Sequence, residues 1–116
     1  MAISEPYELD GVVIGLTELS ICSGTTTLAT ITDDGVYQLW LDAGTMIKGD
    51  EFIVRAYEKV EGTGGVKKIF AQWSLMGVQS EIFVTPTFVL INGWDFTIQR
   101  LAGADRAFDA SIRKVA

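Results

Sequence analysis

The sequence predicts an all-β fold: a single-domain β-sandwich of about eight antiparallel strands, either a jelly roll or an immunoglobulin-like sandwich. Three observations predict it. The chain has 116 residues, the size of one domain. Hydrophobic residues recur with a period of two along most of its length, which is typical of strands that bury one face. Turn-forming residues separate these segments about every ten residues, the spacing of sandwiches and small barrels.

The N-terminal segment differs from the rest of the chain. Residues 1–10 are polar and acidic, contain Pro6 and show no sustained alternation of apolar and polar residues. This composition predicts an extended N-terminal arm that precedes the folded part of the chain. The β-sandwich domain is therefore expected to span residues 11–116.

The first strands of the domain are predicted from β-branched residues. Residues 12–22 and 25–32 are rich in such residues, and the turn-forming pair Ser23-Gly24 separates them. Residues 36–42 then alternate strictly, as in a half-buried strand. One face of that strand carries Tyr37, Leu39 and Leu41, and the other carries Gln38, Trp40 and Asp42.

The middle of the chain predicts an antiparallel pair of strands. Residues 51–60 and 66–76 both alternate, and the glycine-rich segment 61–65 has the length of a hairpin connection. The inward faces of this pair are predicted to carry Phe52, Val54, Ala56, Ile69, Ala71, Trp73 and Leu75.

Three further strands are expected in the C-terminal part. Residues 82–91 contain Pro86, which cannot donate a ladder hydrogen bond and so predicts an edge strand or a bulge. Asn92-Gly93 predicts a type I′ hairpin turn into residues 94–101, and the last strand covers residues 106–115. Their inward residues are Trp94, Phe96, Ile98, Phe108, Ala110 and Ile112.

Composition excludes several classes of function. Nine basic and fifteen acidic side chains give a net charge of −6, which disfavours binding to nucleic acid. The chain has no histidine and a single cysteine, Cys22, so catalytic triads, histidine metal sites and internal disulfides are absent. No apolar run is long enough for a membrane span, and no signal peptide is recognisable. We expect a non-enzymatic protein without cofactor or metal, made in the cytoplasm.

The remaining candidate motifs favour structural roles. Asp33-Asp34 and Asp50-Glu51 are adjacent carboxylate pairs, but neither has the spacing of a recognised calcium site, and the composition around them is that of tight turns. Gly62 to Gly65 lacks the order of a phosphate-binding loop and is expected to be a flexible hairpin loop. The setting of Cys22 favours a buried, unreactive thiol.

Aromatic residues out of phase with the core suggest a protein-binding surface. Trp73 and Trp94 are in phase with buried positions, whereas Trp40, Tyr57 and Phe83 are not. Exposed Trp and Tyr are typical of protein–protein contacts, although a carbohydrate-binding platform stays an alternative. Together with the apolar residues of the arm, the predicted partner-binding residues are Ile3, Tyr7, Leu9, Trp40 and Tyr57.

Four segments, residues 33–42 (DDGVYQLWLD), 51–59 (EFIVRAYEK), 92–100 (NGWDFTIQR) and 111–115 (SIRKV), resemble the small β-rich virion proteins of tailed bacteriophages. Capsid decoration, or cement, proteins are the closest type. The resemblance covers roughly residues 33–115, and residues 1–32 lie outside it.

The resemblance implies a jelly-roll or immunoglobulin-like domain without catalytic activity that docks on an assembled shell. The implied partner is the major capsid protein, the implied state a homo-oligomer (trimer or dimer), and the implied location the capsid surface of the virion. Two alternatives stay open: a carbohydrate-binding or host-recognition module, and a tail or neck structural subunit.

Overall fold

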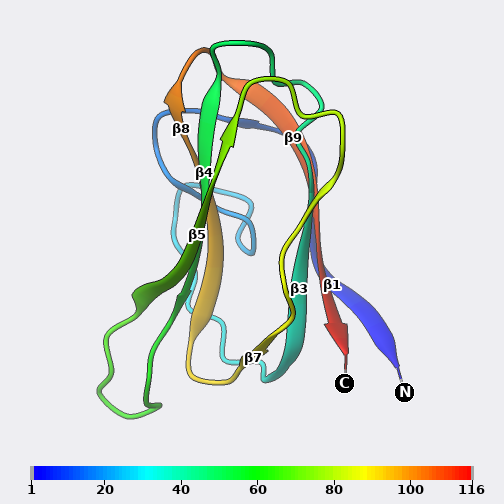
Figure 1. The fold of residues 1–116 in the computed structure, drawn as a ribbon. Helices are drawn as coiled ribbons and strands as arrows, with labels where there is room; N and C mark the ends of the chain where they lie inside the picture. The colour runs from blue at the N-terminus through cyan, green and yellow to red at the C-terminus, as the bar shows by residue number, and fades with distance from the viewer. Residues whose placement is uncertain (1, 116) are drawn as a thin grey trace.

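The computed structural model describes residues 2–115, which form nine strands in two antiparallel sheets packed face to face (Figure 1). The predicted all-β sandwich is confirmed. The strands are β1 (Ile3–Ile14), β2 (Leu19–Ser20), β3 (Gly35–Asp42), β4 (Glu51–Glu58), β5 (Lys68–Met76), β6 (Phe83–Val84), β7 (Phe88–Leu90), β8 (Trp94–Ala102) and β9 (Arg106–Val115).

The order of the strands is that of a jelly roll. The first sheet has the order β1-β9-β3, and β6 and β7 pair one after the other along the free side of β3. The second sheet has the order β2-β8-β4-β5. Because β6 and β7 form one interrupted strand on one edge, two sheets of four strands result, as in the double Greek key of a jelly roll. This order decides between the two expected architectures.

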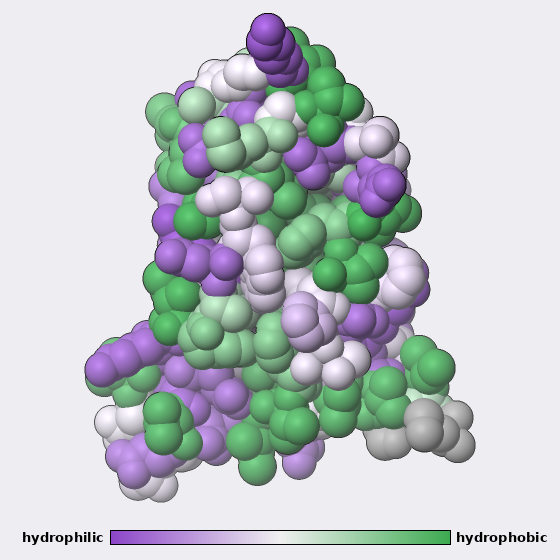
Figure 2. All heavy atoms as spheres, viewed as in Figure 1, coloured by the Kyte–Doolittle hydropathy of each residue, from purple (hydrophilic) through white to green (hydrophobic). Residues whose placement is uncertain are grey.

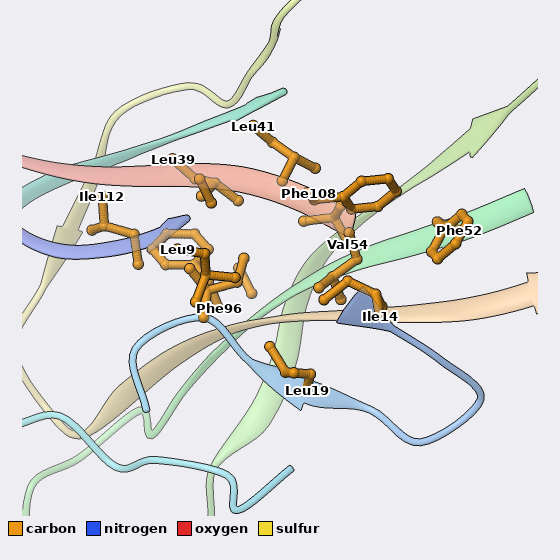
Figure 3. Packing of buried hydrophobic residues seen from close by; sticks show 14 of the residues in the cluster. Leu9, Ile14, Leu19, Leu39, Leu41, Phe52, Val54, Phe96, Phe108 and Ile112 are labelled. Atoms are coloured by element: carbon orange, nitrogen blue, oxygen red, sulfur yellow. The ribbon is translucent and has the colours of Figure 1, made fainter. Parts of the chain in front are cut away.

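The core lies between the sheets and is built from most of the predicted inward residues. Ile69 is an exception: the register shift in β5 sets it opposite Tyr57 on the outer face, where it is 46% exposed. Tyr37, Leu39 and Leu41 of β3 are fully buried, and so are Phe52, Val54 and Ala56 of β4. Figure 3 shows residues of both sheets meeting in this layer. The strict alternation in β3 and β4 therefore predicts correctly which face of each strand is buried in the core.

The first half of strand β8, residues 94–98, is buried on both faces, which the alternation did not predict. Asp95 and Thr97 are buried although they face away from the core. The carboxylate of Asp95 accepts hydrogen bonds from Ser20 Oγ (2.8 Å) and from the backbone N–H of Ala29 (2.9 Å), in the segment after β2. The hydroxyl of Thr97 donates to Glu18, in the loop before β2. The strand predicted over residues 25–32 is therefore wrong: within the described residues this segment makes a single β-bridge, from Ile31 to Trp94.

The predicted N-terminal arm is also wrong, because β1 is an integral strand of the first sheet. It pairs with β9 from Ile3 to Ile14, with register shifts on either side of the segment 7–9. The register shifts, the first of which contains Pro6, break the period of two, so the alternation does not predict this strand. No boundary separates residues 2–10 from the domain; the outermost positions of the expected ranges, residues 1 and 116, lie outside the described residues.

The Asn92-Gly93 segment crosses between the sheets and is not a hairpin turn, since β7 belongs to the first sheet and β8 to the second. Gly93 has a φ of +87°, as expected, but no other residue type in the described part of the chain has a positive φ, which excludes a type I′ turn. The carboxylate of Glu58 holds the crossing by accepting hydrogen bonds from the N–H groups of Ile91 (2.6 Å) and Asn92 (3.0 Å).

Candidate docking face

A row of aliphatic side chains crosses the outer face of the first sheet. Ile3 is opposite Val115, Val115 is opposite Val36, and Val36 is opposite Val89. Opposed residues of antiparallel strands share a face, so these four side chains lie next to one another in the aliphatic row. Ile3 is 71% exposed and Val89 is 76% exposed. The aliphatic row lies at the end of the molecule that carries both chain termini, and Figure 2 shows hydrophobic residues gathered there.

Trp40 and Arg113 lie next to the aliphatic row on the same face. The guanidinium of Arg113 stacks over the Trp40 ring, 4.0 Å from the ring centroid. With Ile3, Val36 and Val115, both residues line a shallow groove of about 230 Å³. Trp and Arg are the residue types that contribute most to protein–protein binding when they are desolvated at a contact.

Hydrogen bonds fix the orientation of this Trp–Arg pair. Trp40 Nε1 donates to Gln38 Oε1 (2.9 Å), and Gln38 Nε2 donates to the backbone oxygen of Thr85 (2.7 Å). On the other side, Arg113 Nε donates to Ser111 Oγ (3.3 Å), whose hydroxyl donates to Glu5. The pair is therefore held in place before any partner binds, which reduces the entropy lost on association.

The other half of this face is acidic. Asp42 and Asp109 are opposed across β3 and β9, and both border a groove of about 300 Å³ together with Glu8 and Asp10. The N–H of Gly11 donates to Asp109 Oδ1 (2.7 Å). Across residues 2–115, no group of three Asp, Glu, Cys or His side chains is arranged to hold a metal ion. The face is thus divided into an aliphatic part and an acidic part, with Trp40 and Arg113 at the border.

Two carboxylates at the border interact with each other. A hydrogen bond from Ser111 holds the pKa of Glu5 below its ordinary value. Hydrogen bonding to Glu5, and the negative charge of Glu5, raise the pKa of Glu8. Glu8 therefore takes up a proton at a higher pH than Glu5 does.

The five predicted partner-binding residues do not form one surface. Ile3 and Trp40 line the same groove on the first sheet. Tyr7 turns inward, where its ring meets Trp94 edge-on at 6.0 Å. Leu9 is only 5% exposed and points into the core (Figure 3), so its expected place on an accessible surface is wrong. Burial follows from its register opposite Ala110, on the inward side of β9.

Tyr57 lies on the outer face of the second sheet, away from Trp40. Its hydroxyl donates to Glu18 Oε2 (2.7 Å), which also accepts from Arg55 (3.3 Å) and from the hydroxyl of Thr97. Burial and the neighbouring Glu18 raise the pKa of Tyr57 to about 12. Tyr57 therefore stabilises the loop that carries Glu18, and its contact with a partner stays a prediction.

Four members of this face were not predicted from the sequence: Val36, Val89, Arg113 and Val115. Alternation places Val36 in phase with Trp40, and Val115 in phase with Arg113, so a partial signal was present. The missing information was the register between distant strands, which brings these residues into one row.

The carboxylate pairs have the structural roles expected from their composition. Asp50 forms an ion pair with Arg106 (2.7 Å), and Asp33 with Lys114 (2.9 Å). Cys22 is half-buried, and desolvation raises the pKa of its thiol. A raised thiol pKa disfavours the reactive thiolate at neutral pH.

No protein-family model matches the sequence, and no curated protein matches it. Solved structures with a similar fold include the Yersinia pseudotuberculosis-derived mitogen, with 10% identity and a TM-score of 0.50 over 99% of this chain and 86% of the mitogen. Disulfide-linked pili of Bacillus endospore appendages give 15% identity and a TM-score of 0.49 over 98% of this chain and 88% of that one.

A chain in the structure of infectious bursal disease virus, Gx strain, gives 15% identity and a TM-score of 0.45 over 97% of this chain and 30% of the viral chain. Within residues 2–115 no helix is long and apolar enough to cross a membrane. At these identities the likeness concerns the fold alone. By its own strand order the chain is a β-sandwich of the jelly-roll type, a fold compatible with a structural or a binding module.

Proposed function

We propose that this protein is a non-catalytic virion structural protein that docks on an assembled bacteriophage capsid and stabilises it. Its partner is the major capsid protein, and it is made in the host cytoplasm before it joins the capsid surface. The observation that carries the proposal is the aliphatic row beside the fixed Trp40–Arg113 pair. The resemblance of residues 33–115 to capsid decoration proteins supports the choice of partner.

The composition of the face fits a specific protein contact. The aliphatic row supplies apolar area, and Trp40 and Arg113 supply a preordered centre. The acidic half, with Asp42 and Asp109, adds a charge pattern that favours partners with basic residues at matching positions. A shell surface that fits this face presents apolar side chains toward Val89 and Val36 and basic side chains toward the acidic groove.

Reconstitution on stripped particles tests the proposal. Purified protein is added to capsids from which it has been removed, and its occupancy is measured by electron microscopy. We expect Val89→Glu and Trp40→Ala each to lower the affinity at least about tenfold, because they disrupt the apolar row and the stacked pair. Wild-type occupancy for both variants would contradict docking through this face.

A matched control separates docking from folding. Val60→Glu introduces the same charge at a position that is 96% exposed, in the loop after β4 and outside the face. We expect it to bind like the wild type. Absence of the protein from purified capsids, or its location in a ring or tube of the tail or neck, would contradict the capsid assignment itself.

A carbohydrate-binding or host-recognition role is the second candidate. It is favoured by one observation: Trp40 borders a groove that also carries Glu8, Asp42 and Asp109, and an aromatic ring beside carboxylates can stack on and hydrogen-bond a sugar. Calorimetric titration with soluble glycans tests this role. Binding that is lost in Trp40→Ala, without capsid occupancy, would favour it over the shell role.

A further inference from the structure

Asn92 is the only asparagine in the chain, and a glycine follows it. The structure requires glycine at position 93 for two reasons. Gly93 has a φ of +87°, and a Cβ atom on it would lie 2.8 Å from the Cγ2 atom of Thr30. The fold therefore keeps an Asn-Gly sequence in the segment that crosses from β7 to β8.

A glycine after an asparagine permits an intramolecular reaction. The Gly93 nitrogen attacks Cγ of the Asn92 side chain, and the lack of a Cβ atom on glycine leaves this approach unhindered. A new N–C bond closes a succinimide ring, and the side-chain NH2 takes up the proton of the Gly93 N–H and leaves as ammonia. Water then adds to either ring carbonyl and breaks its bond to nitrogen, which gives aspartate or isoaspartate. The reaction consumes water, releases ammonia and involves no oxidation or reduction.

At this site the attacking nitrogen has no hydrogen-bond partner, whereas the attacked side chain is held. Within residues 2–115 the backbone N–H of Gly93 donates no hydrogen bond. Asn92 Nδ2 donates to the backbone oxygen of Val60 (2.9 Å), and the Asn92 N–H donates to Glu58 Oε2 (3.0 Å). Ring closure needs the Asn92 side chain to turn toward its own backbone, so the hydrogen bond to Val60 opposes the reaction.

The loop that holds the Asn92 side chain gains little stability from packing. Val60 lies at its start and is 96% exposed, and Val66 lies at its end and is 72% exposed. The residues between them, 61–65, include three glycines. Local opening of such a loop costs less free energy than separation of the strands. Opening breaks the hydrogen bond to Val60 and releases the Asn92 side chain.

We propose that Asn92 is a site of spontaneous deamidation, restrained by Glu58 and by the glycine-rich loop at residues 61–65, and that deamidation loosens the crossing between the two sheets. In the product a carboxylate stands where the amide donated to the Val60 carbonyl, so repulsion between two acceptors replaces a hydrogen bond. The product also carries a negative charge on the residue whose N–H the Glu58 carboxylate binds. This inference does not rest on the proposed docking role.

Mass spectrometry of the intact chain tests the reaction. Purified protein is incubated in mildly alkaline buffer, and the heavier species, in which OH replaces NH2, is followed with time. We expect this species to form in the wild type but not in Asn92→Gln, because glutamine would have to close a larger ring. Peptide mapping should locate the change at residue 92 and find isoaspartate, which direct hydrolysis of the amide does not produce.

Glu58→Ala removes one of the two restraints. The N–H groups of Ile91 and Asn92 lose their acceptor, so we expect deamidation to become at least about fivefold faster. Glu61→Ala is the matched control, because it removes an exposed carboxylate of the same loop and should leave the rate unchanged. The wild type unfolded in urea gives the rate without either restraint. Circular dichroism melting curves establish that both variants are folded.

Asn92→Asp reproduces the aspartate product and tests its consequence. We expect backbone hydrogen exchange in residues 59–67 to be faster than in the wild type, because the loop has lost its hydrogen bond from residue 92. Gln79→Glu is the matched control, since Gln79 Nε2 also donates to a backbone oxygen, that of Met76 (3.0 Å), outside the crossing. This variant makes the same change from amide to carboxylate and should leave exchange in residues 59–67 unchanged.

Four results would overturn the inference. They are a product without isoaspartate, a folded wild type that reacts as fast as the protein in urea, a folded Glu58→Ala that reacts no faster than the wild type, and unchanged exchange in Asn92→Asp. Each of these measurements is made on the isolated chain. Reconstitution on capsids is unaffected by them, so the two proposals fail separately.

Discussion

The backbone of Gly103 lies directly against Asp50, so that a Cβ atom at position 103 would be only 2.7 Å from the Asp50 Cα. This close approach joins the turn between β8 and β9 to the loop that precedes β4. Asp50 strengthens the junction by accepting hydrogen bonds from Arg106 Nε (2.7 Å) and from the N–H groups of Ile47 (2.9 Å) and Ala104 (3.2 Å).

Gly103→Ala should be among the most damaging single-atom additions to the chain. The φ of +86° at Gly103 disfavours any side chain, and the clash with Asp50 adds to this strain. We expect a loss of about 2–4 kcal/mol in the free energy of unfolding, measured by urea denaturation. Gly49→Ala is the control, since its φ is +97° but no atom lies within 4 Å of the added Cβ; it should cost about 1 kcal/mol. Equal losses of unfolding free energy in the two variants would mean that the contact between Gly103 and Asp50 adjusts to the added Cβ at little cost.

The Asp50 carboxyl should make stability depend on pH in the acid range. The hydrogen bond from Arg106, followed by those from Ile47 and Ala104, lowers its pKa from the ordinary 3.8 to about 2. A lowered folded-state pKa contributes stability that is present above the ordinary value and is lost as pH falls toward the folded value. The stability difference between wild type and Asp50→Asn should therefore shrink between pH 4 and pH 2. The control is Glu81→Gln, which changes an exposed carboxyl outside this junction. If the stability of Asp50→Asn and that of the wild type changed in parallel with pH, the lowered pKa of Asp50 would be contradicted.

Phe96→Ala should destabilise the fold far more than Phe70→Ala. Phe96 is fully buried between the sheets, whereas Phe70 is 45% exposed. We expect a loss of about 3–5 kcal/mol at position 96 and a clearly smaller loss at position 70. Thermal melting of both variants measures the difference. Similar melting temperatures would mean that β8 does not anchor the core.

Strand β1 provides two positions with opposite expected effects. Leu9→Ala should lower the free energy of unfolding by about 2–4 kcal/mol, because Leu9 lies in the core. Ile3→Ala should cost less than about 0.5 kcal/mol but weaken capsid docking, because Ile3 is exposed in the aliphatic row. Denaturation and occupancy measured on both variants would separate the two roles. If neither variant docks more weakly than the wild type, β1 is not part of the contact.

The parts of the fold that could be predicted from sequence are those in which one strand face alone is buried. In β3, β4 and β9 the period of two identifies the inward residues, including Leu39 and Phe108. Pattern analysis failed where local geometry departs from that period. Register shifts interrupt the alternation of β1, so the strand could not be recognised from its sequence. Residues 25–32 have high β-propensity, but this segment is held by a hydrogen bond from Ala29 to the Asp95 carboxylate rather than by pairing with a strand.

The candidate site could be predicted only in part. Trp40 was identified because its phase differs from that of the core, and Ile3 because it is apolar in an acidic segment. Arg113 and Val89 could not be found, because their proximity to Trp40 and Val36 depends on pairing between strands that are far apart in the chain. Sequence alternation gives the direction of a side chain but not its neighbours across the sheet.

The pairing of Ile3 with Val115 places the two ends of the chain on neighbouring strands of one sheet (Figure 1). A short peptide linker can therefore join them, and new ends can be opened in the glycine-rich loop at residues 61–65 without separating any strand pair. In such a circular permutant a fused cargo would leave the molecule beside the start of β5. A purification tag attached before Ile3 or after Val115, by contrast, would lie beside the aliphatic row, so binding assays are best made with tags placed in that loop.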